Sequence, residues 1–253
     1  MNFYKEYVII PSSTTSAATT TTTTTTPTPR NYKASNLIRP PPNTDLKSHQ
    51  ECLEDLYEIL ATPPSTYVSI LELGAGVGYT GLKLAMGLPC KVQLTDLEEA
   101  MPLLTENIRL NSHQFHLGPS AVSCEPLVWG APQESYRSTV IPPQNDHKWL
   151  ILASDCVYYE ELHLPLEQTL ATLLSNQGNS STSSHHQLCL LAGMRRWKRD
   201  TTFYSKLGRR TRTSTHTLQC TCLHEVVERP SSNMDHRNIF RIYAVRWVAR
   251  STT

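Results

Sequence analysis

Residues Tyr67–Gly81 read YVSILELGAGVGYTG, and this stretch decides the fold of the chain. Its first seven residues form a short apolar run, which predicts a buried strand. Glycines follow at once, and they permit a tight turn and a close approach between the backbone and a ligand. A helix is expected from Gly81 to Met86, and the first N–H groups of a helix have no partner within it. Strand, glycine loop and helix in this order predict a nucleoside-binding site.

Two carboxylates near the glycine loop indicate which nucleoside derivative it binds. A second strand is expected at Lys91–Thr95, closed by Asp96, which lies 20 residues after Gly76. A carboxylate at that place commonly accepts hydrogen bonds from ribose hydroxyls. Glu72 stands two residues before Gly74, where it can face a cationic ligand but would repel a pyrophosphate. Glu72 therefore favours S-adenosylmethionine over a dinucleotide.

The same loop leaves other interpretations open. Residues 76–81 fit the GxGxxG pattern of NAD(P)-dependent oxidoreductases. Tyr79 and Lys83 also have the Tyr-x-x-x-Lys spacing of some short-chain dehydrogenases. They lie inside the phosphate-loop region rather than far downstream, so we interpret this spacing as chance. A loop that only joins a strand to a helix is the simplest alternative, and the position of Asp96 argues against it.

The rest of the chain alternates between expected strands and helices. The further strands are expected at Ala121–Val128, Trp149–Ala153, Leu188–Ala192, Leu218–Val227 and Ile239–Val248, and the further helices at Asp45–Leu60, Leu97–Asn111, Leu164–Leu174 and Asp200–Leu207. Alternation of this kind predicts an α/β fold with a Rossmann-like, mostly parallel sheet of seven strands. No helix is expected between the last two strands, so they should form a C-terminal antiparallel pair.

Composition excludes several classes of protein. The 253 residues carry 23 Lys and Arg against 22 Asp and Glu, a net charge of +1. This balance provides no broad basic field, so a nucleic-acid partner is not expected. No apolar stretch approaches the roughly 18 residues of a membrane span, so no membrane association is expected. Seven cysteines without a secretory signal indicate reduced thiols and a cytoplasmic protein, with the nucleus left open as a second compartment. No metal site is expected, because Cys220 and Cys222 lack metal-ligand spacing.

The first 44 residues differ in composition from the rest. They include an unbroken threonine run, Thr19–Thr26, and several prolines. Such residues bury too little apolar surface to offset the entropy lost on ordering. We therefore expect a flexible Thr/Pro-rich segment at residues 1–44 and one folded domain at residues 45–253.

Four blocks of sequence, in order, resemble a known family. The blocks are Leu71–Gly78 (LELGAGVG), Thr95–Glu98 (TDLE), Leu127–Gly130 (LVWG) and Ser154–Tyr159 (SDCVYY). The first resembles motif I of the seven-β-strand methyltransferases, and the last resembles the Asp-x-x-Tyr motif of the protein-lysine methyltransferases among them. The nearest resemblance is to the methyltransferase-like 21 group, whose members act on chaperones, the valosin-containing AAA ATPase or elongation factors. It extends over about Ile70–Val248.

The resemblance implies S-adenosylmethionine as cofactor and a role for each matching residue. Asp155 and Tyr158 would be the catalytic pair beside the methyl group and the incoming lysine. The cofactor-binding residues would be Glu72, Gly74, Ala75 and Gly76 at the methionine end, Asp96 at the ribose, Trp129 over the adenine and Ser154 beside the catalytic motif. Two positions depart from the family: no Trp occurs in Asp45–Leu60, and Ser154 stands where Ala is usual. In the family an upstream Trp contacts the cofactor, and we do not expect that contact in this chain.

The expected function is methylation of a lysine in a cytosolic protein by a monomeric enzyme. Within the same fold, a small-molecule or RNA methyltransferase remains an alternative. An NAD(P)-dependent oxidoreductase and a catalytically silent binding module are the alternatives from other classes. Cofactor-induced stabilisation distinguishes among them, because only the methyltransferases would respond to S-adenosylhomocysteine and the oxidoreductase would respond to NAD(H).

Overall fold

The computed structural model describes residues 40–61, 67–132, 149–175, 187–195, 198–228 and 238–250. The connections at residues 133–148 and 176–186 lie outside these ranges. The Thr/Pro-rich segment lies outside them up to residue 39. No helix in the described part of the chain is long and apolar enough to cross a membrane.

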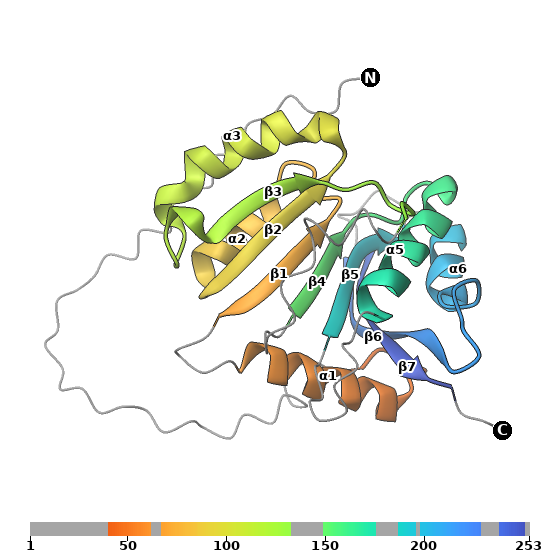
Figure 1. The fold of residues 1–253 in the computed structure, drawn as a ribbon. Helices are drawn as coiled ribbons and strands as arrows, with labels where there is room; N and C mark the ends of the chain where they lie inside the picture. The colour runs from red at the N-terminus through yellow and green to blue at the C-terminus, as the bar shows by residue number, and fades with distance from the viewer. Residues whose placement is uncertain are drawn as a thin grey trace, which may run out of the picture.

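A seven-stranded sheet forms the centre of the fold (Figure 1). In spatial order the strands are β3 (Val122–Pro126), β2 (Cys90–Asp96), β1 (Val68–Leu73), β4 (Trp149–Ser154), β5 (Gln187–Arg195), β7 (Asn238–Ala249) and β6 (His216–Glu228). The first five strands run parallel, and β7 is antiparallel to both of its neighbours. The Rossmann-like fold class and the C-terminal antiparallel pair are confirmed.

Helices cover both faces of this sheet. They are α1 (Leu46–Leu60), α2 (Tyr79–Gly87), α3 (Met101–Asn111), α5 (His163–Ser175) and α6 (Lys198–Lys206), with short 3-10 helices η2 (Glu98–Ala100), η3 (Ser112–Gln114), η4 (Pro119–Ala121) and η5 (Glu160–Leu162). Alternate strand residues point to opposite faces, so Ile70 packs with α1, α2 and α3 while Leu71 packs with α5 and α6. Every expected helix is present, and the one expected from Leu97 begins with the separate turn η2.

Helix α1 begins where its sequence predicts and packs across the C-terminal strands. Asp45 is its N-cap, and the Asp45 carboxylate accepts a hydrogen bond from the Lys47 N–H at 3.2 Å. Cys52, Leu53 and Ile59 are buried in the same core cluster as residues of β5, β6 and β7. The helix is thus held by apolar packing against strands far along the chain.

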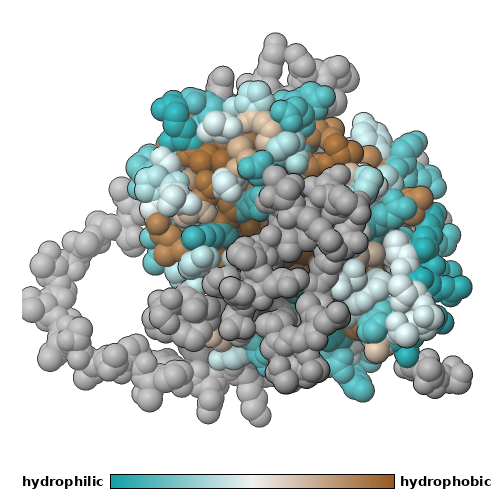
Figure 2. Space-filling model, in the orientation of Figure 1, coloured by the Kyte–Doolittle hydropathy of each residue, from teal (hydrophilic) through white to brown (hydrophobic). Residues whose placement is uncertain are grey.

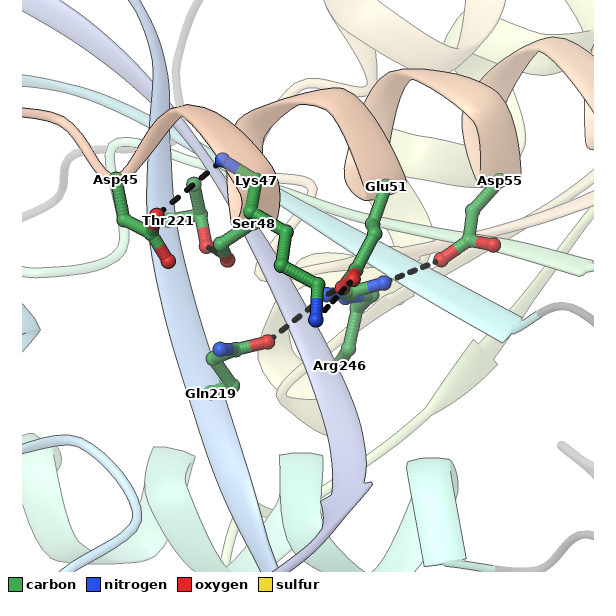
Figure 3. Close-up of polar contacts among 8 residues, drawn as sticks. All are labelled: Asp45, Lys47, Ser48, Glu51, Asp55, Gln219, Thr221 and Arg246. Atoms are coloured by element: carbon green, nitrogen blue, oxygen red, sulfur yellow. Dashed lines mark hydrogen bonds and ion pairs between the residues drawn. The ribbon is translucent and has the colours of Figure 1, made fainter.

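A charged network also joins α1 to the strands (Figure 3). The Arg246 guanidinium on β7 donates to Glu51 at 2.7 Å, Asp55 at 3.0 Å and Gln219 at 2.9 Å. Its side chain is 12% exposed, whereas Glu51 is 42% and Asp55 is 19% exposed. The guanidinium therefore depends on this network for most of its hydrogen-bond partners.

We expect Arg246→Leu to lower the free energy of unfolding by about 2 kcal/mol. Removal of the guanidinium takes one ion pair each from Glu51 and Asp55, and partial exposure of those carboxylates limits the cost. Chemical denaturation of both proteins measures the difference. Arg109→Leu is the control, because the Arg109–Glu106 pair is largely exposed and should contribute little. Equal effects of the two substitutions would contradict an anchoring role for Arg246.

Candidate functional site

Strand β1 ends in a loop whose glycines adopt left-handed backbone conformations. The φ angles are +62° at Gly74, +58° at Gly76 and +81° at Gly78, a region that L side chains rarely occupy. Gly78 then precedes the first residue of α2. The Ala75 N–H donates to the Thr95 carbonyl at 2.9 Å, which holds the loop against the end of β2. The sequence needs glycine here because the chain reverses direction within a few residues.

A cavity of about 330 Å³ opens at the carboxyl ends of β1, β2 and β4, a volume suited to a small organic ligand. It is lined by Gly74, Gly76, Asp96, Leu97, Leu127, Val128, Trp129, Asp155, Cys156, Tyr158, Leu162 and Pro165. Six of the nine residues expected at the site are among them. The other three, Glu72, Ala75 and Ser154, do not line the cavity. The structure therefore brings the two expected catalytic residues into one space with four expected cofactor-binding residues.

Asp96 supports the glycine loop and retains capacity for a ligand. Its Oδ2 accepts a hydrogen bond from the Gly76 N–H at 2.7 Å, and its Oδ1 accepts one from the Leu97 N–H at 2.7 Å. Each carboxylate oxygen has two lone pairs, so each can accept a further hydrogen bond. Two neighbouring ligand hydroxyls match this pair of acceptors.

Trp129 forms an aromatic wall close to the glycine loop. A Cβ atom at Gly74 would lie 2.9 Å from Cζ2 of Trp129 and 2.9 Å from Sγ of Cys156. The absence of a side chain at Gly74 thus leaves room for the indole ring, which packs against the core that includes Leu127. The following Gly130 N–H donates to Oγ1 of Thr169 at 2.9 Å, which ties this turn to α5. Indole, glycine backbone and carboxylate together suit a nucleoside.

Asp155 is placed by an unusual backbone conformation after β4. Its φ angle is +59°, which is uncommon for a residue other than glycine and is tolerated best by Asn and Asp. The Asp155 N–H donates to the Ala192 carbonyl on β5 at 2.7 Å. Asp155 does not cap a helix, because the next helix, η5, has Tyr159 as its N-cap. Helix capping therefore does not explain the aspartate at this position.

Tyr158 and Cys156 both stay protonated at neutral pH. Partial burial, reinforced by the negative charges of Asp96 and Asp155, raises the pKa of Tyr158 above its usual range. Burial raises the pKa of the Cys156 thiol still further, and its Sγ donates to the Leu73 carbonyl at 3.2 Å. The site therefore presents a neutral phenol, while the thiol lacks the thiolate character of a nucleophile.

Glu72 lies beneath the glycine loop rather than in the cavity. It is 2% exposed, and its Oε2 accepts a hydrogen bond from the Gly81 N–H at 2.8 Å. Burial raises the pKa of Glu72 to about 7, against the opposing effect of hydrogen bonds from Gly81 and Thr80. The position of Glu72 in the sequence predicts that this carboxylate faces the ligand. In the structure its contacts instead connect β1 to the first turn of α2.

The raised pKa of Glu72 predicts a pH-dependent stability. Between pH 4.5 and 7 the folded protein keeps the Glu72 proton while the unfolded chain loses it, so stability falls as the pH rises. We expect Glu72 to reduce the unfolding free energy of the cofactor-free protein by about 3 kcal/mol over this interval. Glu72→Gln should remove that part of the slope in denaturation curves measured at each pH. Identical slopes for the two proteins would contradict the assignment.

Several cavity residues were missed by sequence reasoning. Leu97, Leu127 and Cys156 adjoin predicted site residues, so their nearness to the motifs could have indicated them. Leu162 ends η5 and Pro165 lies in the first turn of α5, and only the packing of these helices brings the two residues to the cavity. Within the described ranges, no group of three or more His, Cys, Asp or Glu side chains could hold a metal ion.

The structure gives no support to a dehydrogenase site built on Tyr79 and Lys83. Tyr79 opens α2 and is 53% exposed, and neither it nor Lys83 lines the cavity. A dinucleotide-binding sheet would also run parallel through its sixth strand, whereas β7 enters antiparallel beside β5.

Residues 47–210 match the family model described as lysine methyltransferase. Among curated proteins, the chain is 36% identical over 141 residues to the protein N-lysine methyltransferase METTL21A of Mus musculus, with 56% of each chain covered. It is 32% identical over 152 residues to the protein-lysine N-methyltransferase EFM6 of Saccharomyces cerevisiae, again with 56% of each covered. The match spans a little over half the length of these relatives.

The ribosomal protein L11 methylase of Lactobacillus delbrueckii subsp. bulgaricus superposes with a TM-score of 0.41 at 12% identity, covering 80% of both chains. The family model covers more than half of the chain and includes the glycine loop, Asp96, Trp129 and Asp155–Tyr158. The chain belongs to the lysine methyltransferase family.

Proposed function

We propose that this protein is an S-adenosylmethionine-dependent protein-lysine N-methyltransferase. The observation that carries the proposal is one cavity that collects Asp155 and Tyr158 together with Asp96, Trp129 and the glycine loop. Family membership and the names of the relatives METTL21A and EFM6 support the same conclusion. Residues for holding a nucleoside thus adjoin residues for handling an amine.

The residues present fit S-adenosylmethionine. Nothing lies within 4 Å of a Cβ built at Gly76, so this part of the loop leaves a cradle for the methionine portion, while Gly74 leaves room for the Trp129 ring beside it. The free acceptor positions of Asp96 suit the two ribose hydroxyls, and the Trp129 indole suits the adenine ring. When bound, the cofactor supplies a methyl group on a positively charged sulfur, which is electrophilic without a metal ion.

The task of the protein is to prepare a lysine amine for attack. A lysine with a pKa of about 10.4 is almost entirely protonated at neutral pH, and only its neutral form has a free lone pair. Asp155 attracts the ammonium to the cavity by its negative charge. The Tyr158 hydroxyl, which stays protonated, can form a hydrogen bond with the amine and orient it. Alignment of amine and methyl donor supplies most of the acceleration.

Ala75 and Ser154 keep indirect roles in this proposal. Ala75 fixes the loop through its hydrogen bond to Thr95, and Ser154 ends β4 immediately before the catalytic motif. Glu72 acts in the same way, because it holds the first turn of α2 in place beneath the loop. These three residues support the loops around the cavity without lining it.

We further propose that the enzyme is a cytoplasmic monomer whose substrate is a cytosolic protein of the chaperone, AAA ATPase or elongation-factor type. The net charge of +1 gives no support to a nucleic-acid partner. Gel filtration of the purified protein tests the monomer, and fractionation of cells tests the compartment.

Transfer of labelled methyl groups tests the proposed activity. The purified protein is mixed with S-[methyl-³H]adenosylmethionine and an extract of cells that lack its gene, and the proteins are separated by size. A discrete labelled band that the Asp155→Asn variant does not produce is expected. Label in RNA or in small molecules, with none in protein, would contradict the proposal. Calorimetry with S-adenosylhomocysteine establishes separately whether the cofactor site is intact.

A further inference from the structure

The mouth of the cavity is flanked by two short acidic helices. Helix η2 follows the cavity-lining Leu97 and begins with Glu98 and Glu99. Helix η5 begins with Glu160 and Glu161, and its last residue also lines the cavity. All four glutamates are exposed. Two pairs of exposed carboxylates therefore adjoin residues that line the cavity.

The local charge differs from that of the whole chain. The loops that line the cavity, residues 74–79, 96–100, 127–131 and 154–165, contain no lysine or arginine. They contain six carboxylates: Asp96, Glu98, Glu99, Asp155, Glu160 and Glu161. The chain as a whole has 23 basic residues against 22 acidic ones. The described ion pairs include none of the four glutamates, so their charges add to a local negative field.

Exposed apolar and aromatic side chains line or adjoin the same cavity. Tyr158 is 43% exposed and Tyr159 is 57% exposed, and their ring centroids are 4.7 Å apart. Leu97 and Val128, which also line the cavity, are 49% and 59% exposed. Figure 2 shows hydrophobic surface near the ends of β2 and β3, with hydrophilic side chains beside it. The mouth thus combines exposed aromatic and aliphatic side chains with acidic ones.

We propose that this mouth binds a basic and apolar segment of the substrate protein, in which the target lysine is flanked by arginine or lysine and by large apolar residues. The four glutamates attract basic residues of the substrate because the charges are opposite. This attraction concentrates basic segments near the cavity. The exposed tyrosine pair offers large rigid surfaces of the kind that anchor protein interfaces. The inference rests on the proposed methyltransferase function and adds the class of segment that the enzyme selects.

The same charges disfavour a nucleic acid at this mouth. An RNA acceptor carries a phosphate at every nucleotide, and binding requires basic side chains that neutralise those phosphates. The loops lining the cavity provide none. Association with a basic peptide, in contrast, should weaken when added salt screens the glutamates.

Three fluorescent eleven-residue peptides test the proposal in the presence of saturating S-adenosylhomocysteine. Each has a central lysine between two leucines, and the outer positions carry arginine, glutamine or glutamate. Fluorescence anisotropy should give a dissociation constant at least about tenfold lower for the arginine peptide than for the glutamine peptide. Raising the salt concentration from 50 to 500 mM should remove most of that difference. Equal affinity of the three peptides would overturn the proposal.

Two double variants test whether the peptide binds at the mouth or elsewhere on the acidic surface. Glu98→Gln with Glu160→Gln should weaken binding of the arginine peptide about fivefold to tenfold and leave the glutamine peptide unaffected. Glu54→Gln with Glu58→Gln removes the same charge from exposed positions on α1 and should leave both affinities unchanged. An equal loss in both variants would contradict a specific docking surface.

The outcomes also distinguish this proposal from the proposed function. If labelled methyl groups reach extract proteins but the arginine peptide has no advantage, the docking inference fails and the methyltransferase stands. If a labelled RNA oligonucleotide binds more tightly than the arginine peptide and accepts methyl groups, both fail. Calorimetry confirms in every case that S-adenosylhomocysteine is bound.

Discussion

Replacement of Asp155 by Asn is expected to lower the rate of methyl transfer at least about a hundredfold while the protein still folds and binds its cofactor. Asn keeps the size and shape of the side chain but removes the negative charge that, in the proposed function, attracts the lysine ammonium. A purified methyl-transfer assay under single-turnover conditions measures the rate. Turnover equal to that of the wild-type enzyme would show that the carboxylate has no catalytic role.

The choice of Asn matters because of the backbone at Asp155. Its φ angle of +59° is one that Asn also tolerates. Alanine in this conformation costs about 1–2 kcal/mol, so Asp155→Ala would confound loss of charge with a change in the loop. The comparison is informative in itself. If Asn and Ala variants are equally inactive but only the Ala variant is destabilised, the charge alone accounts for the lost activity.

Gly81→Ala is expected to destabilise the protein by about 3 kcal/mol, although alanine normally favours a helix over glycine by about 1 kcal/mol. A Cβ at Gly81 would collide with Leu94, lie 2.6 Å from Oε2 of Glu72 and lie 2.9 Å from Cγ1 of Val92. The Glu72 carboxylate cannot move away without losing the hydrogen bond from the Gly81 N–H. Denaturant unfolding measures the change.

Gly87→Ala provides a control within the same helix. Nothing lies within 4 Å of a Cβ built at Gly87, and this glycine has no left-handed φ. We expect Gly87→Ala to be neutral or to stabilise the protein by up to about 1 kcal/mol. If both substitutions had the same effect, close packing between α2 and the sheet would not explain the glycine at position 81.

Much of the fold follows from local sequence. Strand β1 and helix α1 lie within a residue or two of their predicted ends, because prolines, glycines and the N-cap Asp45 interrupt the apolar patterns at those points. The gathering of Asp96, Asp155 and Tyr158 was predictable for another reason, since parallel strands place their carboxyl ends at one edge of the sheet.

Other features depend on contacts between distant segments, and local patterns do not contain them. The inward position of Glu72 results from the close approach of Gly81 on α2. Glu167 looks like a helix surface residue, yet it is buried and its Oε1 accepts hydrogen bonds from Gly208, Arg210 and Thr211. Arg246 similarly finds its partners 191 and 195 residues away. The positive φ of Asp155 likewise has no local sequence signal.

The anchoring of α1 has a consequence for folding of the chain during translation. Ser48 hydrogen-bonds with Thr221, 173 positions later, and Arg246 follows Glu51 by 195 positions. At a synthesis rate of roughly 5–20 residues per second, the helix waits about 10 to 40 s for these partners to be translated. Throughout that interval the apolar side of α1, with Cys52, Leu53 and Ile59, lacks the β6–β7 surface that later covers it. This side of the helix therefore completes its packing only after strands β6 and β7 have been translated.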